Sequence, residues 1–397
     1  MKKRRGRKKQ RHRVLKTGLG ILVCLIVVVG IVVFNWTGIQ LGIKGYDKDA
    51  RTTLLKLSEE EIQEYLSLDE IIDLAKWDQV NNQHHYYDYE LYSSDNSSVE
   101  DAVSYVDEFY NTYHTKLKEL GYDLETQRSL MNQLSLDDFG VLADNQLEWK
   151  QVEPYLTING RIIEDLPKYI ESGLEPVEAV MNISYSLIDS RNSSDRTYFL
   201  EEPSNTALLI KKGFSISKDY VPEDLVEVNI PTATKNNQMR SDAAKALETM
   251  YEDAKKEGLI LAVNSAYRSY EEQQKIYDEY FRIYDEVTAA SLVAVPGTSE
   301  HQLGLSVDLT SQSVIDGQYG VFGSTPEYQW VIKNAHKYGF ILRYPSDKID
   351  ITGIANEPWH YRYVGVELAT QLYEEGLTLE EYTLQNGFDY PVIIREE

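Results

Sequence analysis

One uncharged apolar run near the N-terminus limits what this chain can fold into more than any other feature. It reads GLGILVCLIVVVGIVVF over residues 18–34, and Trp36 follows it as an interfacial residue. With its flanking residues the run is long enough to span a hydrocarbon core of about 30 Å. We therefore expect a transmembrane helix over residues 17–37. A buried core helix fits poorly because no polar residue interrupts the run.

A basic segment, residues 1–16, precedes this run and contains ten Lys and Arg residues and no acidic residue. Positive flanks stay in the cytoplasm, so we expect a single-pass protein of the cell membrane with a cytoplasmic N-terminus and an extracellular body. A cleaved signal peptide is the competing interpretation. The run is long for a signal peptide and no small-x-small cleavage site follows it, which favours an uncleaved anchor.

The remainder of the 397-residue chain is strongly acidic, with 30 basic and 64 acidic residues and a net charge of -34. Such a body repels nucleic acid, and we expect no nucleic-acid partner. The only cysteine, Cys24, lies inside the apolar run. The body therefore has neither disulfides nor thiol chemistry, which excludes a cysteine peptidase and Cys-based zinc fingers.

Residues 40–205 form an acidic, tyrosine-rich region that we expect to be mostly helical. Residues 57–77 show helical spacing of apolar residues, with Ser58 as a cap and Glu61 three residues later. Three landmarks recur at offsets of 76 or 77 residues: GYD, LSEEE answered by LSLDD, and SVEDAVSYV answered by EPVEAVMNI. Two copies of one helical module are the favoured interpretation, and chance similarity is the alternative. The region would act as a stalk or as a wall-binding unit.

Residues 206–397 mix helical and strand patterns without a regular βαβ alternation. Helices are expected over 239–258, 269–287, 327–340 and 366–376, and a buried strand over 259–269. This order favours an α+β domain with an antiparallel sheet.

Chemistry concentrates in three separate segments of this second region. His301 and Asp308 lie seven residues apart around Gly304, and EPWH downstream supplies Glu357 and His360. Two histidines and one aspartate form a catalytic zinc set that leaves the fourth position for water. The remaining glutamate is then the natural general base. Arg268, in SAYRS, offers a planar fork for a carboxylate or an oxyanion.

Together these segments resemble the zinc peptidases that include lysostaphin, the D-Ala-D-Ala peptidases and the hedgehog fold. The similarity is greatest to the VanY-type D-alanyl-D-alanine carboxypeptidases. That family has an S-x-H-x-x-G-x-(A or S)-x-D element, a later E-x-W-H and an earlier Y-R-S, which stand here as SEHQLGLSVD, EPWH and AYRS. Ser306 occupies a position where Ala is commoner. The resemblance covers roughly residues 225–390.

The resemblance implies Zn²⁺ bound by His301, Asp308 and His360, with Glu357 as the base and Arg268 at the substrate. The implied activity is a membrane-anchored zinc D,D-carboxypeptidase that removes the terminal D-alanine from peptidoglycan stem peptides. An L,D-carboxypeptidase acting on tetrapeptide stems is the alternative within the class, ahead of an endopeptidase. A non-catalytic, zinc-containing wall-binding module is the alternative outside it.

Two further residues are candidates for substrate binding, and the remaining aromatic residues and histidines are expected to have structural roles. Ser299 is expected either to donate a hydrogen bond to the substrate or to shape the turn, and Tyr267 is expected to form a wall of the site. Trp359 and Tyr361 are expected to pack the strand that positions His360, and the alternative is that one of them lines the pocket. His84, His85 and His114 are interpreted as solvated surface residues rather than metal ligands. His336 is interpreted either as a surface residue or as a residue that contacts the metal ligands.

Overall fold

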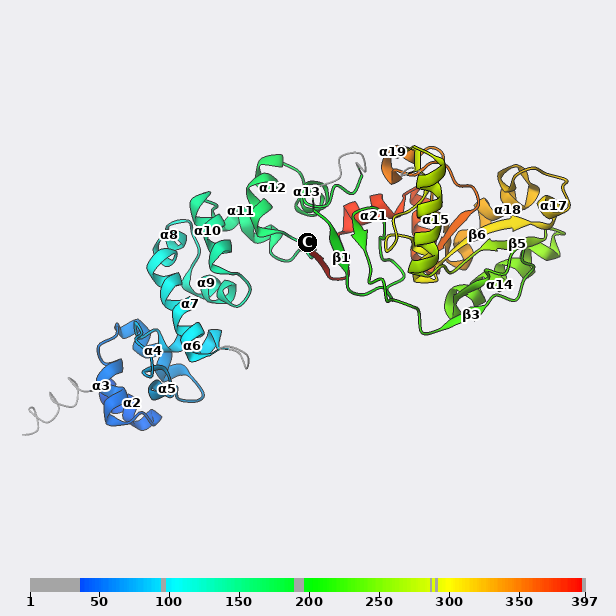
Figure 1. Cartoon of the computed structure of the whole chain (residues 1–397). Helices are drawn as coiled ribbons and strands as arrows, with labels where there is room; N and C mark the ends of the chain where they lie inside the picture. Colours follow the sequence, from blue (N-terminus) through cyan, green and yellow to red (C-terminus); the bar gives the residue numbers. More distant parts are fainter. Residues whose placement is uncertain (1–35, 94–97, 189–195, 286–287, 290–291, 395–397) are drawn as a thin grey trace, which may run out of the picture. The chain divides into compact units, whose positions relative to one another are not determined.

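The computed structural model describes residues 36–93, 98–188, 196–285, 288–289 and 292–394. Contacts divide the chain into two compact units, the first ending at Gln146 and the second beginning at Leu147. Figure 1 shows helices alone in the first unit and both helices and strands in the second.

The basic segment and nearly all of the expected transmembrane helix lie outside the described residues. Of residues 17–37, only Trp36 and Thr37 are described, and they begin helix α2 (Trp36–Lys44). Within the part of the chain that the structure describes, no helix combines the length and apolar character needed to cross a membrane.

Helices joined by short loops make up the first unit. After α2 they are α3 (Lys48–Leu54), α4 (Glu59–Ser67), α5 (Leu74–Trp77), α6 (Tyr86–Tyr92), α7 (Val99–Thr112), α8 (His114–Glu119), α9 (Leu124–Met131) and α10 (Leu136–Asp144). The helical pattern over 57–77 is therefore divided between α4 and α5. Ser58 and Glu61 form the expected capping box at the start of α4.

The two GYD tripeptides of the proposed repeat have the same local structure. Gly45 and Gly121 both have positive φ, and the tyrosine that follows each is buried. Asp47 and Asp123 then cap α3 and α9 by accepting a hydrogen bond from a backbone N–H.

The other two landmark pairs also correspond in local structure. Ser135 builds a capping box with Asp138, as Ser58 does with Glu61. The third pair leads into α7 and α13 (Pro176–Ile183). In both of these helices the alanine and valine of the shared AV dipeptide are buried. Residues that are identical or similar between the two proposed repeats therefore cap helices, or are buried, at corresponding positions.

The second unit contains helices of both α and 3-10 type. These are α11 (Trp149–Val152), η1 (Glu153–Tyr155), η2 (Ile163–Asp165), α12 (Leu166–Ser172), α13, α14 (Ser241–Lys256), α15 (Tyr270–Ile283), η3 (Glu300–Leu303), α17 (Gln312–Ile315), η4 (Phe322–Ser324), α18 (Pro326–Asn334), η5 (Ala335–Tyr338), α19 (Ile349–Thr352), α20 (Val366–Glu375) and α21 (Leu379–Asn386).

The strands of the second unit form three small sheets. They are β1 (Tyr198–Leu200), β2 (Phe214–Ser215), β3 (Leu225–Glu227), β4 (Gln238–Arg240), β5 (Leu261–Ser265), β6 (Ser306–Ser311), β7 (Phe340–Leu342), β8 (His360–Tyr363) and β9 (Val392–Ile394). The central sheet has the order β5-β6-β8-β7, and every neighbouring pair in it is antiparallel. The expected α+β class with an antiparallel sheet is confirmed.

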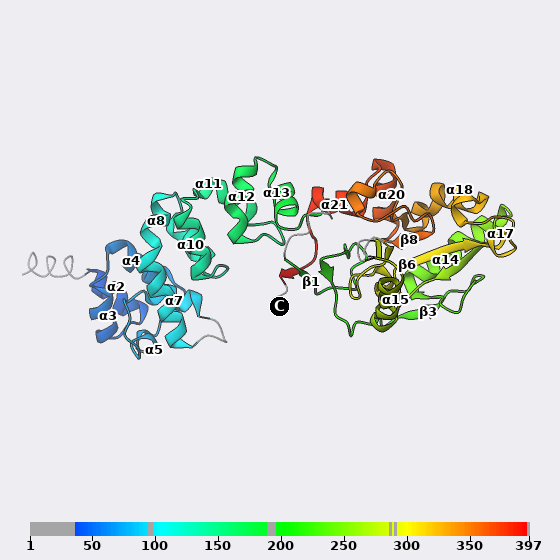
Figure 2. The same cartoon turned by 45° about the horizontal axis from the view of Figure 1, so that its top comes forward.

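Helices cover both faces of the central sheet. Figure 2 shows α15 on one side of β6 and β8, and α20 on the other. Successive residues of a strand point to opposite faces. His360 therefore faces the side lined by α15, whereas Tyr361 is fully buried on the side lined by α20 and η5.

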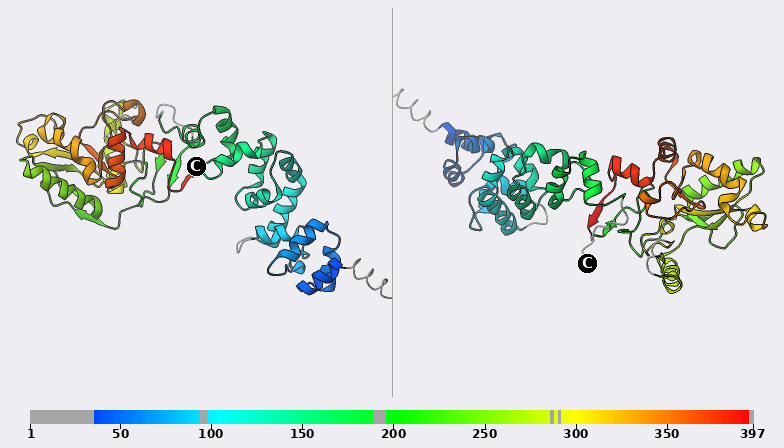
Figure 3. Two further views of the ribbon diagram at one scale, coloured as in Figure 1. Left: turned by 180° about the vertical axis from the view of Figure 1, so that it is seen from behind. Right: turned by 90° about the horizontal axis from the view of Figure 1, so that it is seen from above.

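The division between the units lies nearer the N-terminus than the expected boundary between residues 205 and 206. The reason is that the chain's last residues return to the segment before 206. α13 packs against α21, and β9 pairs antiparallel with β1. Figure 3 shows β9 beside β1 from two further directions. Residues 147–205 therefore share a core with the C-terminal residues.

Candidate active site

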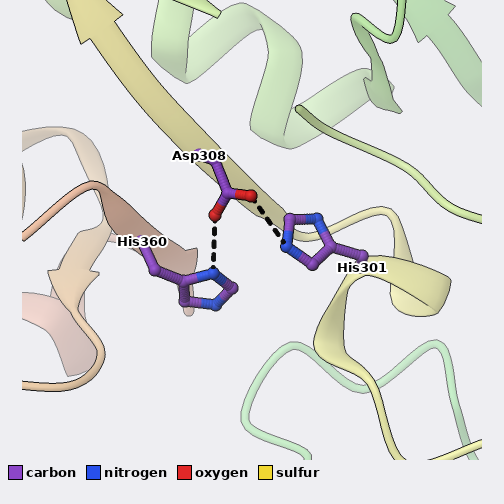
Figure 4. A group of neighbouring side chains, drawn as sticks. All are labelled: His301, Asp308 and His360. Atoms are coloured by element: carbon purple, nitrogen blue, oxygen red, sulfur yellow. Dashed lines mark hydrogen bonds and ion pairs between the residues drawn. The ribbon is translucent and has the colours of Figure 1, made fainter. Parts of the chain in front are cut away.

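Three side chains from three elements meet beside the two inner strands of the central sheet, β6 and β8. Asp308 on β6 lies directly opposite His360, the first residue of β8. His301 comes from η3, which precedes β6. Figure 4 shows the two carboxylate oxygens of Asp308 pointing to different imidazole rings. The sequence correctly grouped these residues, although His301 lies on a 3-10 turn and not on the strand.

Gly304 turns the chain between the two ligands of the SEHQLGLSVD segment. It ends η3 in the left-handed conformation with φ of 68°, which non-glycine residues rarely adopt. A Cβ at this position would also lie 3.0 Å from the Leu225 side chain. The expected bend at this glycine is confirmed, and it lets His301 and Asp308 approach one point.

The distances fit a tetrahedral zinc ion. His301 Nε2 lies 3.5 Å from Asp308 Oδ2, and His360 Nδ1 lies 2.9 Å from Asp308 Oδ1. One ligand atom from each residue lies within 4.8 Å of the other two. Zinc bonds of about 2.0–2.2 Å place tetrahedral ligand atoms roughly 3.4 Å apart. In the described part of the chain, this is the only group of three or more His, Cys, Asp or Glu side chains arranged to hold a metal.

An orphaned buried atom supports the same assignment. His301 Nε2 is buried and has no hydrogen-bond partner, whereas its Nδ1 lies 2.6 Å from the carbonyl oxygen of Ala266. A carbonyl only accepts, so Nδ1 carries the proton and Nε2 presents a lone pair. Such a lone pair is expensive to bury unless a metal or a donor meets it.

The electrostatics hold two of the ligands in the form that binds metal. Burial, with help from nearby Arg268, lowers the pKa of His301 to about 4. Burial would raise the pKa of Asp308, but the two imidazoles hold it well below its ordinary value. Hydrogen bonds to Asp308 and Glu300 overcome the effect of burial on His360 and raise its pKa to about 9. Metal binding must therefore displace a proton from His360.

Glu357 stands beside this group, as the sequence predicted. Its Oε2 lies 3.9 Å from His360 Nδ1, and its side chain is 23% exposed. Burial raises the pKa of Glu357 above its ordinary value. A carboxylate with a raised pKa next to a metal-bound water is suited to accept a proton and pass it on.

Arg268 is held at the wall of the site by a residue that the sequence analysis did not single out. Its Nη1 donates to Gln273 Oε1 at 3.0 Å, and Gln273 Nε2 donates to the carbonyl of Ala294 at 2.8 Å. Arg268 Nε is buried without a partner, and Nη2 lies 3.9 Å from Asp308 Oδ2. The sequence did offer one indication of this contact, because Gln273 lies five residues after Arg268, near the start of the next helix.

A cavity of about 500 Å³ opens over these side chains. It is lined by all of the predicted metal ligands, by Glu357 and Arg268, and by aromatic residues that include Tyr280, Tyr344 and Trp359. A cavity of this size suits a small peptide or a similar ligand.

Ser299, which is buried, lines this cavity, as its proposed contact with substrate requires. Tyr267 is not among the lining residues, so the structure does not bring it to the site. Trp359 is 40% exposed and lines the cavity, which is the alternative to the favoured packing role. Tyr361 is fully buried behind the strand, as expected.

The other histidines form no metal site among the described residues. His84 is exposed. His85 was expected to be solvated, but it is half-buried because its ring stacks on Tyr110, with 3.8 Å between the ring centroids. His114 Nδ1 lies 2.8 Å from Gln127 Oε1. His336 stacks on Tyr373 on the opposite side of the sheet from the cavity.

Comparison with known proteins finds similar carboxypeptidases. The family described as VanY, D-alanyl-D-alanine carboxypeptidase, matches residues 236–366. A putative carboxypeptidase of Bacillus subtilis, YodJ, is 44% identical over 187 residues, which are 46% of this chain and 68% of that protein. A D-alanyl-D-alanine carboxypeptidase of Enterococcus faecalis is 46% identical over 145 residues, 34% of this chain and 52% of that protein.

A solved structure with similarity to this chain is a mutant of the vancomycin resistance D,D-pentapeptidase VanY in complex with Zn(II). It is 38% identical, its alignment covers 45% of this chain and 98% of that chain, and the TM-score is 0.38. The family match over residues 236–366 covers the part of the second unit that carries the cavity.

Proposed function

Because this chain belongs to the VanY family of D-alanyl-D-alanine carboxypeptidases, we propose that it is a zinc D,D-carboxypeptidase that trims peptidoglycan stem peptides. The bond cleaved is the one before the terminal D-alanine of a pentapeptide stem. The curated relative in Enterococcus faecalis carries that activity in its name, which supports this choice.

One observation carries the proposal. Asp308 reaches both histidines with separate oxygens, at 3.5 Å and 2.9 Å, while Glu357 and Arg268 line the same cavity without being ligands. Three ligands leave the fourth position of a tetrahedral zinc open for water or substrate, which is the arrangement of a catalytic site and not of a structural one.

The protein's own residues then have separate tasks. When bound, zinc would polarise the scissile carbonyl and lower the pKa of a bound water. Glu357 accepts the proton of the attacking water and delivers it to the amine of the departing alanine. Arg268 binds the terminal carboxylate of the peptide with its planar fork, and Gln273 keeps that fork oriented.

We also propose that the protein is anchored in the cell membrane with this unit outside the cell. Two sequence features support the proposal: the apolar run over 18–34 and the ten basic residues before it. Peptidoglycan lies on that side of the membrane, so anchoring would bring the enzyme to its substrate.

The test is mass spectrometry of synthetic muropeptides incubated with the full-length protein in detergent, with and without a chelator. Chelator-sensitive loss of one alanine from the pentapeptide is the expected result. Loss from the tetrapeptide alone would assign an L,D-carboxypeptidase instead. Cleavage of neither peptide by a folded, zinc-loaded protein would point to an endopeptidase or to a wall-binding module without catalysis.

A further inference from the structure

Glu300 is a buried carboxylate next to the metal ligands that the proposed mechanism does not use. It precedes His301 on η3, and its side chain is 2% exposed. Its Oε2 lies 3.2 Å from Nε2 of His360 and accepts a hydrogen bond of 3.2 Å from Ser306. Burying a carboxylate is expensive unless it is paired and hydrogen-bonded, so its position calls for an explanation.

Two buried arginines hold the other oxygen of Glu300. Arg343 Nε donates to Oε1 at 2.7 Å, and Arg362 Nη1 forms an ion pair with the same atom at 3.1 Å without the geometry of a hydrogen bond. Because guanidinium groups only donate, Oε1 is committed to the arginines and Oε2 is left for His360. The carboxylate cannot turn without breaking an ion pair in the protein interior.

The arginines are themselves fixed by partners from distant parts of the second unit. Arg343 makes a bidentate ion pair with Glu380 on α21, at 2.9 Å and 2.7 Å. Arg362 Nη2 donates to the carbonyls of Thr206 and Leu208 at 3.0 Å and 3.1 Å. Glu300, Arg343, Arg362 and Glu380, here called the buried ion cluster, carry two charges of each sign. Glu380 lies beyond the residues 236–366 that match the family.

This arrangement decides which nitrogen of His360 faces the metal. An ionised carboxylate only accepts, so the nitrogen beside Glu300, Nε2, must carry a proton. The other nitrogen, Nδ1, faces Asp308 and is the one placed to bind zinc. A carboxylate on the far nitrogen of a ligating histidine orients the ring and sets its tautomer.

We infer that Glu300 is a positioning residue that fixes the orientation and tautomer of His360, and that the buried ion cluster holds Glu300 in place for this task. The inference rests on the metal site of the proposed function. It does not depend on which stem peptide is cleaved.

The most direct test replaces Glu300 by an amide of the same shape. In Glu300→Gln the amide oxygen is held by the two arginines, which only donate, so the NH₂ group turns toward His360. His360 must then accept at Nε2 and carry its proton on Nδ1, where it blocks the metal. We expect zinc affinity, measured by competition with a chromogenic chelator, to fall about 10- to 100-fold.

Glu380→Gln is the matched control. It removes one negative charge from the same buried ion cluster but does not touch His360, so both variants should lower the melting temperature of the metal-free protein. Only Glu300→Gln should weaken zinc binding beyond about twofold. Equal loss of zinc affinity in both variants would reduce Glu300 to a structural role, and unchanged affinity in Glu300→Gln would overturn the inference.

A measurement on the unmutated protein covers the case in which Glu300→Gln does not fold. The full-length protein is labelled with ¹⁵N-histidine and loaded with ¹¹³Cd in place of zinc, and His360 is assigned by its absence in His360→Gln. Coupling of ¹¹³Cd to Nδ1, with a protonated Nε2, is expected. Coupling to Nε2 would refute the inference. None of these readouts uses hydrolysis, so a loaded but inactive protein would contradict the proposed function alone.

Discussion

Nδ1 of His360 lies 2.9 Å from Oδ1 of Asp308, and the two residues stand directly opposite each other on β8 and β6. Opposed residues of an antiparallel pair have side chains on the same face and close together. The register of the strands therefore builds two thirds of the metal site, and the η3 turn adds His301. Any change that slips this register would separate the ligands.

Replacing Glu357 by Gln should separate metal binding from catalysis. The variant keeps the shape of the side chain but cannot accept a proton, so we expect kcat to fall by about 10²- to 10⁴-fold. Zinc content, measured by atomic absorption, should stay near one ion per chain because Glu357 is not a ligand. The control is Glu367→Gln on the exposed side of α20, which should change neither quantity. Normal hydrolysis by Glu357→Gln would show that another group is the base.

Removing Gln273 should weaken substrate binding through Arg268. Gln273→Ala deletes the 3.0 Å hydrogen bond that orients the guanidinium group. A hydrogen bond to a charged group contributes about 1.5–3 kcal/mol, so we expect KM for the stem peptide to rise about tenfold or more with a smaller change in kcat. The neighbouring Gln274 bonds only to exposed Asp278, and Gln274→Ala should leave KM unchanged. A large fall in kcat alone would argue that Arg268 acts on the reacting centre.

The metal ligands could be predicted from the sequence because their residue types are restrictive and their spacing is local or follows a recognisable order. Gly304 was also predictable, since only glycine readily adopts the left-handed turn found there. The capping boxes at Ser58 and Ser135 follow rules that span three residues. Each of these features depends on residue types that lie within a short segment of the sequence.

The supporting residues could not be predicted because their partners are far apart along the chain. Glu300 meets Arg343 across 43 positions, and nothing near either residue indicates the pairing. Trp359 was interpreted mainly as a packing residue, but it precedes β8 (His360–Tyr363) and lines the cavity, whereas Tyr361 within the strand packs as expected. Residues two apart within a strand face the same side, so the two residues are separated because β8 starts after Trp359, and a single sequence does not fix such a boundary.

Asp165 should make the stability of the second unit depend on pH in acid. Burial would raise its pKa, but Lys168, Arg196 and Ser184 together lower it below the ordinary value. A depressed folded pKa contributes stability above the unfolded pKa of about 3.9, and this stability is lost as pH falls through the folded value. Asp165→Asn should therefore melt well below the wild type at pH 7.

The difference in melting temperature between Asp165→Asn and the wild type should shrink as the pH is lowered from about 5 to 3. Differential scanning calorimetry across this range measures it. The adjacent Glu164 is 70% exposed, and Glu164→Gln should follow the wild type at every pH. A constant difference between Asp165→Asn and the wild type would mean that the charge of Asp165 contributes nothing.

Arg128 should be essential to the stability of the first unit. It makes a bidentate ion pair with Glu64, at 2.8 Å and 2.9 Å, and a second ion pair with Asp88, whose side chain is 4% exposed. Arg128→Ala would leave Asp88 buried without a cation, and breaking such a pair costs about 3–5 kcal/mol. Lys76 pairs with Glu90 where both side chains are well exposed, so Lys76→Ala should cost no more than about 1 kcal/mol. Hydrogen exchange of the α6 and α9 amides measures both variants, and equal protection in the two would contradict the prediction.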